Sequence, residues 1–461
     1  MAWYDSAVFY HIHSLSLCGC EHESIESDGY QFHKLTKWAE HAKKMGCNAI
    51  YIGPVFKAEM QGHGITDYYR IDKRLGKNED FKQWVAKCHE LGIKVVVDAV
   101  FNHVGRSFFA FQHLRNNGKK SAYREWFSNV NFSGDNEYGD GFQYEKWGGY
   151  MRLVKLNILS PWLHDYHFDT VRYWIHEFDI DGIRIDAIDE MDYDFIKELR
   201  KTAVSMKPGF WMAGELPDRE YGRWVNDKML HSAPNNELQS AFISAHNNGN
   251  YPLIAHLLRG VEELCPYTKL YIFADNHDVS HIYEKLNHME HRKLIALLMY
   301  TVYGTPSLYC GSEFSRQYQD KDSEEVQKNS LELWNYKNAY TQDEITYLHC
   351  LLGRAKHQFP ELSFGSYQQL LVTQKQFAFG RVLRKTAVIT ILNMDDEPAH
   401  LEIPLPFPVK RTLDVLEASI NWEQGLGKGL EFHESTEFKT AKEKLVMNLP
   451  GNGGALIWVM A

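Results

Sequence analysis

The stretch GIRIDAIDE (residues 182–190) decides the fold class. Ile183 and Ile185 alternate with Arg184 and Asp186, so an extended chain directs two apolar side chains to one face and two charged ones to the other. The residues just before it, 168–181, have the apolar spacing of an amphipathic helix. A strand that follows such a helix is typical of a parallel sheet covered by helices, where a charged strand face needs an explanation.

Short β-rich runs alternate with helical patterns on both sides of this stretch. The helical patterns include residues 32–46 and 79–92. The predicted strands are residues 7–12, 49–53, 94–100, 182–187, 210–215, 228–233, 269–275 and 307–311, of which 228–233 is the least regular. Eight strands with helices between most of them predict an α/β fold, a closed (β/α)8 TIM barrel. The alternative is an open doubly wound sheet, but no glycine-rich fingerprint follows the first strand.

Two regions depart from this alternation and predict further domains. Residues 102–165 are rich in Asn, Gly and aromatic side chains and contain no clear strand–helix unit, which predicts a small lobe inserted after the third strand. The barrel would then comprise residues 1–101 and 166–350. From about residue 364 short alternating runs return, and they predict a C-terminal all-β sandwich domain over 360–461.

Composition limits the partners of this chain. It has 461 residues, of which 44% are hydrophobic, and a net charge of −10, which argues against nucleic acid as a partner. The N-terminus lacks the pattern of a signal peptide, and no apolar run reaches membrane-spanning length. The seven scattered cysteines are typical of reduced thiols (Cys18, Cys20, Cys47, Cys88, Cys265, Cys310 and Cys350). We therefore expect a cytoplasmic protein without a membrane partner; the oligomeric state stays open.

Carboxylates stand where several of the predicted strands end. Asp98, Asp186 and Glu215 close the third, fourth and fifth strands, and Asp278 follows the seventh. One such carboxylate would most simply be a helix cap or an ion-pair partner, but four at corresponding ends are hard to explain in this way. In a TIM barrel the strand ends carry the active site. Arg184 would face the barrel lumen beside Asp186 and keep that carboxylate ionised.

Two carboxyl groups in different surroundings can hydrolyse a glycosidic bond with retention of configuration. Asp186, beside an arginine, suits the nucleophile, whereas Glu215 lies in the apolar run FWMAGELP (210–217) and suits the acid and base. His103 and His277 neighbour the same strand ends and could donate hydrogen bonds to sugar hydroxyls. A purely structural role for either histidine is the alternative.

The motifs around these residues resemble those of the α-amylase family, family 13 of the glycoside hydrolases. The resemblance rests on DAVFNH (98–103), GIRID (182–186), MAGE (212–215) and NHD (276–278), in the family's order. It implies that Asp186 is the nucleophile, Glu215 the proton donor and Asp278 the third catalytic carboxylate. The same resemblance implies a set of substrate-binding residues, namely Asp98, Asn102, His103, Arg184, His277 and His63.

One further motif narrows the resemblance. LVKLN (153–157) is similar to the M-P-K-L-N of the cyclomaltodextrinase, neopullulanase and maltogenic amylase group. Members of that group usually carry an extra N-terminal β domain, whereas this chain begins at the first predicted barrel strand. Most relatives have a tyrosine two residues after the histidine that matches His63, and this tyrosine stacks under the sugar; Ile65 stands there instead. Ala187, after the proposed nucleophile, is the type found in many members that cleave α-1,4 bonds.

The resemblance does not decide whether the protein binds a structural calcium ion or which reaction it catalyses. In many members the asparagine that matches Asn102 ligates a structural calcium, but one asparagine is not a full ligand set. We therefore expect no required cofactor and no metal in the reaction, and a structural calcium stays open. The expected reaction is hydrolysis of maltodextrins or cyclomaltodextrins. A transglycosylase on the same site is the main alternative, with acceptor contacts from the lobe (Trp126, Phe127, Trp147 and Tyr150). A non-catalytic scaffold would have lost the carboxylates that this chain keeps.

Overall fold

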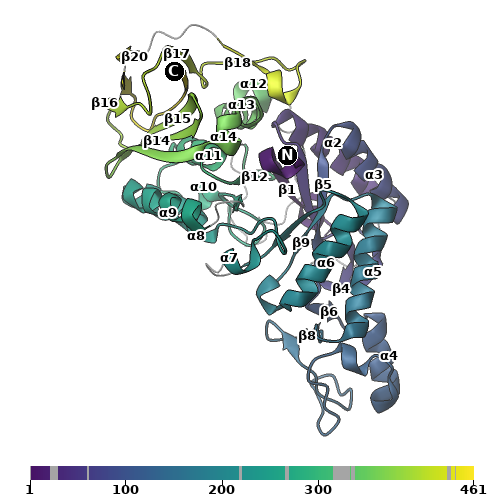
Figure 1. Cartoon of the computed structure of the whole chain (residues 1–461). Helices are drawn as coiled ribbons and strands as arrows, with labels where there is room; N and C mark the ends of the chain where they lie inside the picture. Colours follow the sequence, from purple (N-terminus) through teal and green to yellow (C-terminus); the bar gives the residue numbers. More distant parts are fainter. Residues whose placement is uncertain are drawn as a thin grey trace.

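The computed structural model describes residues 2–20, 30–59, 62–216, 221–264, 269–314, 333, 338–432, 438–441 and 443–461. Helices and parallel strands form its central region (Figure 1). The C-terminal strands β13 to β22 gather at one end of the view, and the segment with α4, β6 and β8 projects from the other. Among the described residues, none of the helices combines the length and the apolar character needed to cross a bilayer.

The central sheet contains seven parallel strands. Their order is β10-β9-β5-β2-β1-β12-β11, and every pair is parallel. The strands are β1 Phe9–His13, β2 Ala49–Gly53, β5 Lys94–Ala99, β9 Gly182–Ile185, β10 Trp211–Gly214, β11 Tyr271–Ile272 and β12 Thr305–Tyr309. Each lies within or overlaps a strand predicted from sequence, and this curled parallel sheet confirms the predicted fold class.

The prediction of a regular strand at residues 228–233 is wrong. This segment nevertheless lies between β10 and β11 and connects the two edges of the sheet. This segment makes isolated parallel bridges, from Ser232 to β10 and from Pro234 to β11. The amide of residue 231 donates to the carbonyl of residue 212 over 2.8 Å, and the amide of Tyr271 donates to the carbonyl of residue 233 over 2.8 Å. Because Pro234 has no N–H and the segment leaves β10 after one bridge, a continuous ladder does not form.

Helices cover the outside of this sheet. The three helical stretches predicted from sequence are present as α2 Tyr30–Lys44, α3 Asn78–Glu90 and α5 Pro161–Phe178. The other long helices that follow barrel strands are α6 Tyr193–Met206, α8 Asn236–Asn248, α9 Tyr251–Leu264, α11 His291–Thr301 and α13 Glu344–Gln358. Short helices complete the set, namely α1 Ser14–Cys18, α7 Tyr221–Trp224, α10 Ile282–Lys285, α12 Ala339–Gln342 and α14 Pro360–Phe364. The core therefore lies between the strands and this helical layer.

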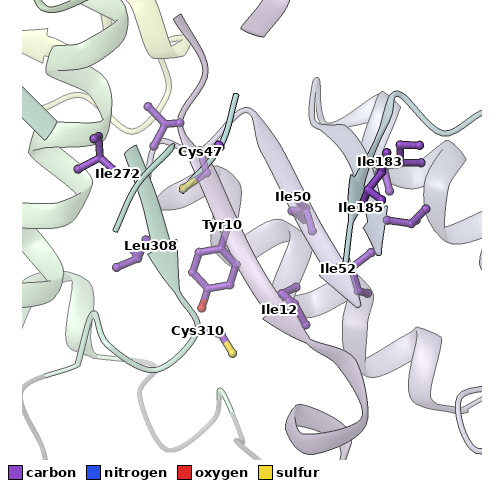
Figure 2. Close-up of a cluster of buried hydrophobic side chains, with 14 of the residues drawn as sticks. Tyr10, Ile12, Cys47, Ile50, Ile52, Ile183, Ile185, Ile272, Leu308 and Cys310 are labelled. Atoms are coloured by element: carbon purple, nitrogen blue, oxygen red, sulfur yellow. The ribbon is translucent and has the colours of Figure 1, made fainter. Parts of the chain in front are cut away.

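Strand alternation sorts the side chains between the helical layer and the lumen. Figure 2 shows Tyr10 of β1, Ile50 of β2 and Ile183 of β9 in the buried apolar cluster. Ile183 and Ile185 are fully buried, as the alternation in GIRID predicts. The side chains of Arg184 and Asp186, each 13% exposed, point the other way and reach solvent at the barrel mouth.

The segment after β5 forms a small sheet with one helix beside it. Its elements are β6 His103–Gly105, α4 Phe109–Asn117, β7 Lys146–Trp147 and β8 Tyr150–Lys155. The strand order is β6-β8-β7, with antiparallel pairs. A separate hairpin, β3 Phe56–Glu59 with β4 Gly64–Ile71, follows β2 and packs near β6. Both segments thus lie at the carboxyl ends of barrel strands.

The C-terminal strands form two main antiparallel sheets that share a core. The first sheet has the order β13-β14-β15-β22-β17, and the second has β16-β21-β20. The strands are β13 Ser366–Val372, β14 Gln376–Leu383, β15 Thr386–Asn393, β16 Ala399–Pro404, β17 Arg411–Asp414, β18 Ser419–Ile420, β19 Leu430–Glu431, β20 Phe438–Ala441, β21 Lys444–Leu449 and β22 Gly454–Met460. Ile389 and Ile457 of the first sheet pack with Ile403 and Leu445 of the second.

The cysteines that the structure describes are all buried. They are Cys18, Cys20, Cys47, Cys88, Cys310 and Cys350. The seventh, Cys265, lies outside the described residues. Burial in apolar surroundings raises the pKa of Cys47 and of Cys88, so these thiols stay protonated and inert at neutral pH.

Candidate active site

Arg184 joins three of the predicted carboxylates. It lies on β9, and its Nη1 donates to Asp98 Oδ1 over 2.9 Å and to Asp186 Oδ1 over 2.8 Å. Its Nη2 lies 2.8 Å from Glu215 Oε2. Each carboxylate comes from a different strand end, namely β5, the residue after β9 and the residue after β10. This one guanidinium therefore fixes the spacing of the three carboxyl groups. The charged face of the strand GIRID exists because Arg184 binds these carboxylates.

The charge of Arg184 also sets which carboxyl groups are ionised. Burial would raise the pKa of Asp98, but the charge of Arg184 and the hydrogen bond from it overcome this effect and hold that pKa below the usual value. Burial by itself would lower the pKa of Arg184. The surrounding acidic groups outweigh burial and raise this pKa above its usual value, so the guanidinium stays charged. Asp98 and Arg184 thus form an ion pair at the bottom of the site, in which both groups carry their charge.

Glu215 differs from Asp98 in its electrostatic surroundings. Burial raises its pKa; Arg184 opposes this, and the charge of Asp186 together with a hydrogen bond to Asp186 raises the pKa further. The backbone N–H of Ala187 donates to Glu215 Oε2 over 3.3 Å. Ala187 has a φ of +46°, a conformation that is uncommon for a residue with a side chain. The raised pKa suits Glu215 to carry a proton.

His277 and Asp278 bring the segment after β11 to the same place. The Nε2 atom of His277 lies 3.4 Å from Asp278 Oδ2, and its buried Nδ1 has no hydrogen-bond partner among the described residues. Burial raises the pKa of Asp278, with Arg184 opposing and Glu215 adding to the effect. His63 lies between these groups and β5, with its Nε2 atom 3.8 Å from Asp98 Oδ2. His277, Asp278 and His63 thus surround the carboxylates on the solvent side.

Asn102 and His103 form the wall toward the lobe. The Nδ1 atom of His103 lies 2.7 Å from Asn102 Oδ1, and burial lowers the pKa of His103 to about 3, so the ring is neutral. Its Nε2, like the amide nitrogen of Asn102, is buried without a hydrogen-bond partner in the described part of the chain. Such atoms are expected where a polar ligand completes the bonding. The structure therefore brings all nine predicted site residues into one region.

The lobe aromatics divide into core and site positions. Trp126 and Phe127 are buried and pack on Tyr123 and Phe111, so they fill the lobe and are not available as a platform for an acceptor sugar. Trp147 stacks on His103 with ring centroids 5.7 Å apart and an angle of 15° between the planes. Tyr150 is exposed and lies under the guanidinium of Arg152. Trp147 alone of the four proposed residues touches a predicted site residue.

Sequence reasoning missed a group of rings on the first two strands. His11 lies 4.4 Å from Tyr51 and 5.2 Å from His277, measured between ring centroids. His13 stacks on His277 at 5.6 Å and 26°. Burial lowers the pKa of His13 to about 3, so it is neutral. The alternation of His11 and His13 with buried Tyr10 was the available signal, because it places both rings on the lumen face.

A cavity of about 330 Å³ opens beside Glu215 and Asp278. Arg184 and His277 also line it, and its inner part is aromatic, formed by Trp211, Tyr271 and Phe273. Its volume lies within the range of small-molecule sites, and a few polar groups within apolar walls are typical of such sites. Acidic groups and flat rings together suit a neutral polyhydroxylated ligand.

Ile65 does not supply the stacking platform that a tyrosine would provide. It pairs with Ala58 across the β3–β4 hairpin and is 3% exposed, in the main core. We therefore expect Ile65→Tyr to overpack this core and to lower the free energy of unfolding by about 1–3 kcal/mol. Urea denaturation measures the loss; Tyr69→Phe, on the same strand, is the control. An Ile65→Tyr protein as stable as the unchanged chain would show that this position has room for the ring.

The residues around Asn102 do not fit a calcium ion. The Oδ1 atom of Asn102 is occupied by the ring of His103, and its carbonyl accepts the N–H of Leu156. Among the described residues, the side chains spaced for a metal are His63, Asp98 and Asp186, but Arg184 already bonds to both carboxylates. A hard cation needs six or more oxygen ligands, and this arrangement does not offer them.

The fold and the site together define a class, the TIM-barrel enzymes whose carboxylates stand at the strand ends. Within it, the model of the α-amylase catalytic domain matches residues 35–346. The chain belongs to the α-amylase family, as the motifs predicted.

Curated relatives agree with this assignment. The chain is similar to a cyclomaltodextrinase of Thermoanaerobacter pseudethanolicus, 29% identical over 373 residues, which cover 77% of this chain and 62% of the relative. It is also similar to an intracellular maltogenic amylase of Bacillus subtilis, 27% identical over 376 residues, which cover 79% of this chain and 62% of the relative. The match thus spans less than two thirds of the length of these relatives.

Solved structures agree with the fold. A debranching enzyme from Nostoc punctiforme superposes with a TM-score of 0.80 at 23% identity, over 100% of this chain and 99% of that one. The cyclic α-maltosyl-(1→6)-maltose hydrolase from Arthrobacter globiformis gives a TM-score of 0.78 at 21% identity, with 100% of both chains covered. At these identities the likeness establishes the fold alone.

Proposed function

We propose that this protein is a retaining glycoside hydrolase that cleaves α-glucosidic bonds, mainly α-1,4, of maltodextrins or cyclomaltodextrins. The observation that carries the proposal is the placement of Asp186 and Glu215 on one guanidinium, together with the burial that raises the pKa of Glu215. Relatives named cyclomaltodextrinase and intracellular maltogenic amylase support the substrate class and a cytoplasmic location. A transglycosylase would use the same carboxylates and differ in the acceptor that resolves the intermediate.

In the first step Asp186 attacks the anomeric carbon while Glu215 gives its proton to the departing glycosidic oxygen. The carbon–oxygen bond of the substrate breaks, and an ester between Asp186 and the sugar forms. In the second step Glu215 takes a proton from water, which attacks the same carbon and releases Asp186. Arg184 binds Asp186 Oδ1, which leaves Oδ2 as the attacking atom. His103 and His277, both neutral, would bind sugar hydroxyls through their unpartnered ring nitrogens.

The protonation of Glu215 predicts the alkaline side of the pH profile. The first step needs Glu215 protonated, and burial raises its pKa, so activity persists above the usual pKa of a glutamate, about 4.3. We expect kcat/KM on maltoheptaose to fall as the pH rises through one ionisation above that value. With Glu215→Gln and an activated aryl maltoside this fall should disappear. A fall that remains unchanged in the variant would assign the ionisation to another group.

Product analysis tests the proposed reaction and substrate. The pure protein is incubated with maltoheptaose and, separately, with β-cyclodextrin, and proton NMR follows the products from the first minutes. Short sugars that appear first as the α-anomer are expected. Early products longer than the substrate would move the assignment to a transglycosylase, and first release of the β-anomer would contradict retention.

A further inference from the structure

A second cavity lies at the end of the barrel opposite the candidate active site. Its volume is about 900 Å³, and it is bounded by helices α13 and α14 and by the turn between β14 and β15. Ser6, just before β1, also lines it. The neighbouring backbone of Gly304 immediately precedes β12. The amino ends of the barrel strands therefore face this cavity, whereas the carboxylates described above stand at the carboxyl ends.

The cavity is lined by basic side chains. Arg384, Lys385 and Lys356 contribute to its wall, and no carboxylate occurs among the lining residues that the structure describes. His357 also lines it, but burial lowers the pKa of this ring to about 4, so the ring is neutral. Lys356 is 2% exposed, and its Nζ donates to the carbonyls of Gly304 and Leu362 over 3.3 and 2.7 Å. These two carbonyl oxygens accept hydrogen bonds from the Lys356 amine but bring no negative charge to it.

Two further cations lie close behind this wall. Burial lowers the pKa of Lys356 well below its usual value, and the charges of Arg381 and Lys269 lower it further. Lys269 donates to the carbonyl of Asp5 and lies 4.5 Å from the ring centroid of Phe364. The carboxyl group of Glu361, on α14, is turned to Trp458, whose Nε1 donates to it over 3.0 Å. Positive potential therefore accumulates at this cavity.

The turn that carries Arg384 and Lys385 has an unusual choice of residues. Leu383 pairs with Thr386, so the turn contains only these two residues, and both are exposed. Arg384 has a φ of +58°. Two-residue hairpin turns need a positive φ at this place and strongly favour Gly, Asn or Asp there. An arginine accepts a conformational cost at this position, which is understandable if its charge is used.

Two more lining residues indicate what the ligand offers besides charge. Ser363 is 1% exposed, and its Oγ has no hydrogen-bond partner among the described residues, so a polar group at this wall is unused. The ring of Phe364 is 37% exposed beside it. We propose that this cavity binds a phosphorylated sugar, with the phosphate held by Arg384, Lys385 and Lys356 and the sugar ring against Phe364. Arginine and lysine are the side chains that bind phosphate most readily.

Isothermal titration of the full chain with glucose 1-phosphate, inorganic phosphate and glucose tests this proposal. Saturable binding of glucose 1-phosphate is expected, with weaker binding of inorganic phosphate at the same site. The double variant Arg384→Glu/Lys385→Glu should weaken both by at least about tenfold, because it replaces two charge-assisted donors by acceptors. Lys119→Glu/Lys120→Glu, in exposed positions beside α4, makes the same charge change and should leave both affinities unchanged.

A third variant separates the sugar from the phosphate. Phe364→Ala should weaken glucose 1-phosphate several-fold and leave inorganic phosphate unaffected. Hydrolysis of maltoheptaose should be unchanged in all three variants, which shows that they fold. The absence of saturable phosphate binding in the unchanged chain would overturn the proposal, as would equal affinities in the Arg384→Glu/Lys385→Glu and unchanged proteins. If only glucose binds, the ligand occupies the active-site cavity and the anion site does not exist.

Discussion

Replacing Asp186 by Ala is expected to lower kcat on maltoheptaose by about 10⁴-fold or more. The carboxylate that attacks the anomeric carbon is then missing, and the remaining groups do not form the ester intermediate. Sodium azide is expected to restore turnover in part, because the small anion fits the space that the carboxylate leaves. Azide would attack from the face opposite the departing oxygen, so the rescued product is a β-glycosyl azide, identified by proton NMR.

The control for this experiment is Asp189→Ala, three residues further along the same segment. It removes a carboxylate from the 3₁₀ turn that follows the strand end, and we expect it to keep activity within a few-fold of the unchanged enzyme. Near-normal activity of Asp186→Ala would contradict the assignment. So would loss of activity with an α-glycosyl azide as the rescued product, because that product requires an intact nucleophile.

The second large effect is expected for Glu215→Gln, and it depends on the leaving group. On maltoheptaose the variant should lose about 10²–10⁴-fold in kcat/KM, since the departing sugar oxygen needs a proton. On 4-nitrophenyl α-maltoside the first step should be nearly as fast as in the unchanged enzyme, because nitrophenolate departs without one. A burst of nitrophenol followed by slow turnover is then expected, as the missing base slows the attack of water.

Equal losses on both substrates would contradict the role of Glu215 as the acid. Gln239→Leu provides a comparison, since Gln239 also lines the active-site cavity but donates to the carbonyl of Ala274. Any change that it causes should be similar for both substrates, because the residue has no part in proton transfer. The ratio of the two kcat/KM values is therefore the quantity to compare, and it is insensitive to a partial loss of folded protein.

The sequence predicted the fold and the carboxylates for a common physical reason. A strand in a parallel sheet alternates its faces, so GIRID necessarily directs Ile183 and Ile185 to the helices and Arg184 and Asp186 to the lumen. The parallel order of the strands then brings Asp98, Asp186 and Glu215 to one edge. Local patterns thus determine the site wherever a functional residue lies at a strand end.

Features that depend on several distant segments were not predicted. The sixth barrel position consists of two isolated bridges, at Ser232 and Pro234. The neighbouring strands β10 and β11 hold this segment in place. Trp126 and Trp147 have the same residue type in the same lobe, yet one packs in the core and the other stacks on His103. Only the tertiary arrangement separates them, because neither lies in a long periodic segment whose faces can be read.

Trapping the covalent intermediate tests the central claim most directly. The protein is treated with an activated fluorosugar, 5-fluoro-α-glucosyl fluoride, which forms the ester readily and releases it slowly; the digested protein is then sequenced by mass spectrometry. We predict a single added sugar on the peptide that contains residues 182–190, located at Asp186 and lost on prolonged incubation with maltose as acceptor. A sugar on another carboxylate, or no covalent adduct in an enzyme that turns over the reagent, would contradict the retaining mechanism built on Asp186.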